Sequence, residues 1–96
     1  MTGTTRSSAD LDPRRKRLLF HAWHRGTREM DLLLGRFTDA VIADLDEAAL
    51  AEMEALMRVP DGELYRWITG QDAVPANHQS ATLDRVIEFH TNGFSQ

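Results

Sequence analysis

Apolar residues in this chain recur at helical spacing, and that periodicity restricts the fold more than any other feature. The clearest run is Met30, Leu33, Leu34, Phe37 and Val41, at i, i+3, i+4, i+7 and i+11, which places all five on one helix face. No stretch alternates between apolar and polar residues for long enough to predict a strand. A chain of 96 residues allows one domain. The sequence therefore predicts an all-α fold, a compact five-helix bundle in a single domain.

Start and stop signals divide the chain into these five helices. Asp, Ser, Thr and Asn side chains can accept hydrogen bonds from the first amides of a helix, while Gly and Pro end helices. The expected caps are Asp12 (followed by Pro13), Thr27, Asp44 or Asp46, Asp61, and Asn77 or Ser80. The expected stops are Gly26 as a left-handed C′ residue, Pro60, Gly70, and Asn92 with Gly93.

The same periodicity predicts the core. Gly35 weakens the second helix, so we expect it to be there because it allows a neighbour to pack closely. Trp23 and Trp67 lie within apolar stripes, which favours core packing over a platform for stacking bases. The other residues expected to point inward are Leu18, Leu19, Ala22, Leu50, Met53, Leu56, Met57, Leu64, Ile68, Leu83, Val86 and Ile87.

The two ends of the chain differ in composition and charge. Residues 1–11 are mostly small and polar and are interpreted as a flexible N-terminal tail, with residues 12–96 forming the bundle domain. Residues 1–28 hold seven Lys/Arg and two Asp/Glu, whereas residues 29–96 hold four and thirteen. A basic end on an acidic body is compatible with nucleic acid, a membrane surface or a charged protein partner. The acidic body would repel phosphate, which disfavours nucleic acid.

Several kinds of chemistry find no support in the sequence. The absence of Cys excludes disulfides, thiolate metal sites and thiol nucleophiles, and it fits a reducing compartment. No apolar run approaches the roughly 20 residues that a membrane-spanning helix needs, so no membrane insertion is expected. His21 and His24 have i, i+3 spacing, but no His-Glu-x-x-His pattern accompanies them. Gly-x-Ser-x-Gly and Gly-rich phosphate loops are also absent, so we predict no catalytic and no metal-binding residues.

The stretch "HRGTREMD", residues 24–31, allows two interpretations. In the first it is a capped turn: Arg25 binds the last carbonyls of the first helix, and Glu29 and Asp31 complement the positive end of the second. In the second it is a surface for a partner. Gly26 would let another backbone approach closely, and Arg25, Arg28 and Glu29 would offer directional charged groups around it.

A family resemblance favours the second interpretation. "KRLLFHAWHRGTREMDLLLGRF" resembles the flavin-assembly factors of succinate dehydrogenase, the SdhE type of bacteria and the assembly factor of mitochondria. The family pattern Arg-Gly-x-x-Glu-x-Asp corresponds to Arg25, Gly26, Glu29 and Asp31, followed by three leucines. A second family feature matches at Asp61, Leu64, Tyr65 and Trp67. The resemblance covers about residues 14–91, and Thr27 stands where many members have Met.

The resemblance implies a cytoplasmic bacterial assembly chaperone rather than an enzyme. It would bind the flavoprotein subunit of succinate dehydrogenase or fumarate reductase and promote covalent attachment of FAD to a histidine of that partner. It would hold no cofactor stably and would act on FAD held by the partner. The partner-binding residues would be Arg25, Gly26, Thr27, Arg28, Glu29 and Asp31. The alternatives are a helical adaptor or nucleic-acid-binding module unrelated to flavin, and a flavin transferase, for which no dinucleotide-binding motif is present.

Overall fold

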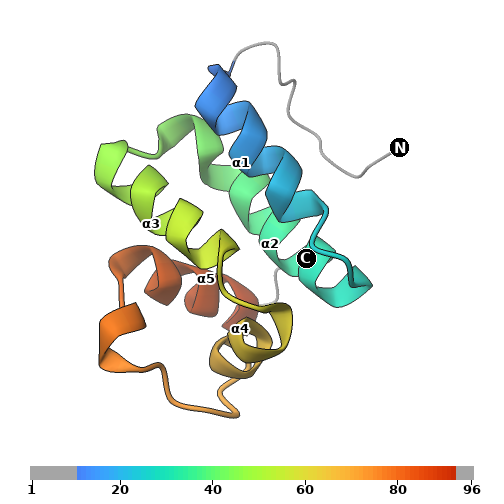
Figure 1. Ribbon diagram of the computed structural model, residues 1–96, viewed down its shortest axis with the longest axis vertical. Helices are drawn as coiled ribbons and strands as arrows, with labels where there is room; N and C mark the ends of the chain where they lie inside the picture. The colour runs from blue at the N-terminus through green and yellow to red at the C-terminus, as the bar shows by residue number, and fades with distance from the viewer. Residues whose placement is uncertain (1–10, 93–96) are drawn as a thin grey trace.

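Five α-helices and two short 3₁₀ helices make up the computed structural model, which describes residues 11–92 (Figure 1). The predicted all-α, single-domain bundle is confirmed, and no strand occurs between residues 11 and 92. None of the helices in this range is long and apolar enough to cross a membrane. The α-helices are α1 (Pro13–Trp23), α2 (Arg28–Val41), α3 (Glu47–Met57), α4 (Asp61–Ile68) and α5 (Ala81–Thr91). The 3₁₀ helices are η2 (Ile42–Asp44) and η3 (Ala76–His78).

Four of the predicted N-caps form. In each, the side-chain oxygen accepts a hydrogen bond from the backbone N–H three residues later, which satisfies an amide that the helix itself leaves unpaired. Where the sequence left two candidate caps, one of them is the N-cap in the structure. Helix α3 is capped by Asp46 rather than Asp44, and α5 by Ser80 rather than Asn77. The four caps are Asp12, Thr27, Asp46 and Ser80.

Two predicted helix boundaries were wrong in detail. Pro60 is the N-cap of α4 and makes no side-chain cap, whereas Asp61 is the first helical residue and its carboxylate is bound elsewhere. Helix α1 ends at Trp23 with His24 as its C-cap, so Gly26 lies beyond the C′ position. Gly26 nevertheless has φ +116°, a conformation that favours glycine. Gly93 lies outside the described residues.

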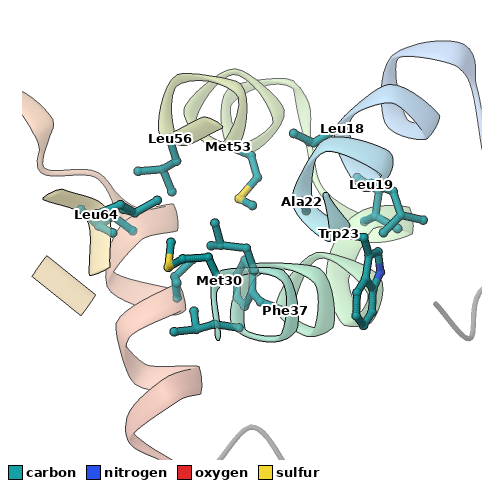
Figure 2. Packing of buried hydrophobic residues seen from close by; sticks show 14 of the residues in the cluster. Leu18, Leu19, Ala22, Trp23, Met30, Phe37, Met53, Leu56 and Leu64 are labelled. Atoms are coloured by element: carbon teal, nitrogen blue, oxygen red, sulfur yellow. The ribbon is translucent and has the colours of Figure 1, made fainter. Parts of the chain in front are cut away.

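One apolar core joins all five α-helices. Figure 2 shows side chains from α1, α2, α3 and α4 directed into it, with Met30 and Met53 facing the centre from opposite sides. Every residue that the periodicity placed inward is buried, except for Val41, Met57 and Ile87, which are half-buried. Leu11, the last residue of the predicted tail, is also buried, whereas residues 1–10 lie outside the described range.

Gly35 lies against the Trp23 ring, which confirms the close packing expected at this position. A Cβ atom at residue 35 would lie 2.3 Å from Cδ2 of Trp23 and 2.5 Å from its Cε3. These distances are far below van der Waals contact, and the atoms belong to a ring whose own side chain is only 7% exposed. The α1–α2 pairing therefore depends on the missing side chain at residue 35.

Gly35→Ala is expected to lower the free energy of unfolding by about 1–3 kcal/mol, because the overpacked ring must move although Ala favours the helix. Urea unfolding followed by circular dichroism measures it. Gly62→Ala is the control, since a Cβ at residue 62 would meet only Arg66 Nη1 at 3.7 Å. That variant should be at least as stable as the parent. Equal stability of the two variants would contradict a tight contact between Gly35 and Trp23.

Candidate functional site

The α1–α2 loop, residues 24–27, lies against the turn between α3 and α4, and Arg25 joins the two. Its Nε donates to Asp61 Oδ1 at 2.7 Å, and its Nη2 lies 2.6 Å from the same oxygen. Nη1 donates to the carbonyl of Met57 at 2.7 Å, and Nη2 donates to that of Val59 at 2.6 Å. The Arg25 side chain is only 9% exposed. We call this arrangement the Arg25–Asp61 clamp.

The clamp solves a local problem at the end of α3. The last carbonyls of a helix lack partners within it, and a cationic side chain can satisfy them. We expected Arg25 to bind the carbonyls of α1 in the capped-turn interpretation, and this expectation was wrong. The guanidinium binds the end of α3, which lies more than 30 residues away in the sequence. Arg25 therefore connects two turns that are distant in the sequence and does not cap its own helix.

Asp31 holds the backbone of the same loop. Its Oδ1 accepts hydrogen bonds from the Arg25 N–H at 2.5 Å and from the Gly26 N–H at 3.2 Å. Asp31 also lies in the first turn of α2, where a carboxylate complements the helix dipole. Two residues of the family pattern, Arg25 and Asp31, thus have partners inside the chain.

The other four predicted site residues, Gly26 to Glu29, are exposed. Thr27 uses its hydroxyl to cap α2, accepting from the Met30 N–H at 3.3 Å. The side chains of Arg28 and Glu29 have no hydrogen bond or ion pair to another residue within 11–92. A cation and a carboxylate, neither with a side-chain partner in the described part of the chain, therefore lie close to a glycine with positive φ.

The clamp brings the two family features together. A hollow of about 300 Å³ separates the start of α2 from the start of α4, and Glu29 and Tyr65 both line it. In the second feature, Leu64 and Trp67 belong to the core, while Asp61 and Tyr65 face the site. The sequence did not indicate this pairing, because the two features lie about 30 residues apart. The remaining lining residues of this Glu29 hollow are Thr27, Met30, Asp61 and Gly62.

The histidines do not form a metal site in the part of the chain that the structure describes. Within it, no group of three or more His, Asp or Glu side chains could hold a metal ion. The His24 ring stacks on Phe20 with centroids 4.0 Å apart, and its Nδ1 lies 2.7 Å from the Phe20 carbonyl oxygen. His78 packs near the Trp67 ring, with centroids 5.0 Å apart. His24 is therefore a surface side chain fixed by its neighbours.

The site combines a hydrogen-bonded loop, exposed charges and a small hollow, which together suit binding of another macromolecule. Open hollows of this size do not enclose a substrate or exclude water as a reaction centre would. The fold and the site thus define a small helical protein with a charged patch next to a hydrogen-bonded loop on its surface.

Comparison with known proteins identifies the family. Residues 16–90 match the family described as the flavinator of succinate dehydrogenase, and the chain belongs to that family. It is 38% identical over 79 residues to the FAD assembly factor SdhE of Acetobacter pasteurianus, covering 82% of this chain and 72% of that protein.

Mitochondrial relatives match as well. The chain is 32% identical over 82 residues to succinate dehydrogenase assembly factor 2 of Dictyostelium discoideum, covering 85% of this chain and 57% of that protein. It is 32% identical over 89 residues to the Danio rerio protein of the same name, covering 91% and 56%. The chain thus spans a little over half the length of these two relatives. The family suggested by the residues from Lys16 to Phe37 is confirmed.

Proposed function

We propose that this protein is an assembly chaperone for the flavoprotein subunit of succinate dehydrogenase or fumarate reductase. It would bind the immature subunit and promote covalent attachment of FAD to a histidine of that subunit. Family membership and the names of the relatives support this function. The observation that supports it most directly is the exposed surface from Gly26 to Glu29, which the Arg25–Asp61 clamp connects to the start of α4.

The proposed role is positioning rather than catalysis by this chain. Attachment requires the partner's histidine and flavin to be close and correctly aimed, and orientation of this kind contributes greatly to rate. A chaperone that binds only the attachment-competent conformation of the flavoprotein shifts the population toward it. In this proposal the chain holds no cofactor stably and acts on FAD within its partner. In this proposal FAD attachment takes place in the cytoplasm, where a bacterial flavoprotein subunit is synthesised.

We assign two different roles to the six proposed partner-binding residues, according to their exposure and their internal contacts. Gly26, Thr27, Arg28 and Glu29 would contact the partner directly, because they are exposed. Arg25 and Asp31 would act mainly by holding the loop, because their polar groups bind other parts of the chain. The Gly26 position allows the partner's backbone to approach, since nothing lies within 4 Å of the site of a Cβ.

The first experiment measures covalent flavin on the cognate succinate dehydrogenase flavoprotein. Purified apo-flavoprotein is incubated with FAD, with and without this protein, and flavin fluorescence is read after denaturation and gel separation. The proposal expects the protein to raise the amount or rate of covalent flavin. No change, together with no detectable complex between the two proteins, would refute it.

Glu29→Ala is expected to slow covalent flavin attachment by about tenfold, the usual size of losing one charge-assisted hydrogen bond at an interface. The bundle should remain folded by circular dichroism. Glu63→Ala is a matched control, because Glu63 is also exposed in the first turn of its helix, so both variants lose a similar dipole interaction. Equal effects of the two substitutions would remove Glu29 from the proposed interface.

A further inference from the structure

A second hollow of the protein lies outside the Gly26–Glu29 surface. It is an open groove of about 710 Å³ between α1 and the C-terminal part of α3, two helices that lie next to each other (Figure 1). Arg25 and Asp61 form part of its wall, and Asp61 also lines the Glu29 hollow. His24 lines the groove and also a smaller hollow beside Gly26. The groove therefore continues directly from the proposed partner-binding surface.

Some of the charges in this groove are neutralised within the protein. Arg14 forms a bidentate interaction with Glu54, in which Nε and Nη2 donate at 3.0 and 2.9 Å. The Nη1 of Arg14 also donates to Glu47. Arg25 is neutralised by Asp61 in the clamp. These two arginines and the two groove-lining carboxylates therefore balance one another.

Two arginines remain, and they face the groove from both sides. Arg17 on α1 and Arg58 at the end of α3 are exposed, and neither side chain has a hydrogen bond or ion pair to another residue within 11–92. The hydrogen bonds from Arg14 lower the pKa of the Glu54 carboxyl, and the charges of Arg58 and Arg17 act in the same direction. Arg17 and Arg58 line the groove from different helices, one from α1 and the other from the end of α3.

The excess charge of the groove is opposite in sign to that of the whole chain. Four arginines and two carboxylates line the groove, whereas the protein has a net charge of −4. Positive potential concentrated in a hollow of an acidic protein attracts a localised anionic group and leaves an extended polyanion repelled by the remaining surface.

We propose that the groove between α1 and α3 docks an acidic segment of the flavoprotein partner, with carboxylates binding Arg17 and Arg58. This inference rests on the proposed function and extends the interface beyond the Gly26–Glu29 surface. An acidic peptide fits better than FAD itself, because the aromatic rings in the groove lining are His21 and His24, and the His24 ring already stacks on Phe20. Leu18 and Met57 are the apolar residues in the lining, enough for the stem of a side chain.

A charge-reversal pair tests the location of the contact. Arg17→Glu should weaken binding to the cognate apo-flavoprotein by about tenfold or more and should make the affinity less dependent on salt. Arg58→Glu should have a similar effect. Lys16→Glu is the matched control, because Lys16 is exposed on the same helix, does not line the groove and loses the same charge. Its affinity should stay within about threefold of the wild type.

A cross-linking experiment identifies the occupant without changing the charge. Lys16 is the only lysine in the chain. The double variant Lys16→Arg with Arg17→Lys moves that single side-chain amine into the groove, and a zero-length carbodiimide then joins it to any carboxylate in contact. Mass spectrometry should find the amine of residue 17 linked to an Asp or Glu of the flavoprotein, in a yield well above that of Lys16 in the wild type.

The outcomes separate this inference from the proposed function. If the wild type binds the flavoprotein and Arg17→Glu and Arg58→Glu bind equally well, the groove proposal fails while the function stands. The groove proposal also fails if Lys16→Glu weakens flavoprotein binding as much as Arg17→Glu does, or if cross-links form from Lys16 alone. Either result would indicate general electrostatic attraction rather than docking in the groove. Binding of FAD or of mixed-sequence DNA by the isolated protein, abolished by Arg17→Glu, would replace the acidic segment with that ligand. A wild type that binds no flavoprotein overturns both proposals.

Discussion

Arg25→Met is expected to lower the free energy of unfolding by about 3 kcal/mol, the lower end of the cost of removing one member of a buried ion pair, since the Asp61 side chain is 24% exposed. The variant leaves Asp61 without its cation and removes the hydrogen bonds to the carbonyls of Met57 and Val59. Met retains much of the apolar stem, so the loss comes mainly from the guanidinium. Urea unfolding monitored by far-ultraviolet circular dichroism gives the difference directly.

Two further variants separate the contribution of the ion pair from that of the hydrogen bonds to the carbonyls. Arg25→Lys keeps the charge near Asp61 but cannot reach three acceptors with a planar fork, so its stability should lie between wild type and Arg25→Met. Asp61→Asn removes the ionic partner and leaves the carbonyl acceptors, so it should cost less than Arg25→Met. Wild-type stability of Arg25→Met would show that the clamp does not hold the two turns together.

The clamp also connects stability with activity. Once Arg25 is removed, the start of α2 and the start of α4 are no longer tied, although Glu29 and Tyr65 themselves are unchanged. We therefore expect Arg25→Met to impair flavin attachment even at temperatures where the variant is fully folded. Wild-type activity in the folded variant would show that the relative position of the two helix starts does not matter for the partner.

Gly26→Arg is expected to weaken binding of the flavoprotein by at least about 100-fold, because a long side chain would occupy the space that the partner's backbone must enter. Among residues 11–92 no atom lies within 4 Å of a Cβ at this position, and Gly26 is exposed, so the new side chain has room to extend into solvent. The φ of +116° adds a backbone cost of about 1–2 kcal/mol, which a bundle of this size should survive. Titration calorimetry with the apo-flavoprotein measures the affinity.

Gly26→Ala separates the bulk of the side chain from the strain of the backbone. It carries the same conformational cost as Gly26→Arg but adds a single carbon atom, so it should lose stability similarly and still bind within a few fold. If Gly26→Ala binds as poorly as Gly26→Arg, the glycine matters for the loop conformation and not for close approach. If Gly26→Arg binds normally, the partner does not approach this position.

The sequence by itself determined the helices, most of their caps and the core. These features depend on residues three to seven positions apart, such as Thr27 with the Met30 amide, or the stripe from Met30 to Phe37. Local hydrogen bonds and a period of 3.6 residues are enough to predict them. The need for glycine at residue 35 was also predictable, because a weak helix former in the middle of a strong helix indicates close packing.

Only the tertiary structure decided which charged groups are available to a partner. Arg25, Arg28, Arg17 and Arg58 look alike in the sequence, yet Arg25 is buried in the clamp while the other three face solvent. Asp61 likewise was predicted to cap its own helix and instead binds Arg25. The pairing of two charges depends on which turns, distant in the sequence, pack together in the fold. A local sequence pattern does not specify the distance between such turns. A long side chain can reach several neighbours, so its partner is settled only when the helices pack.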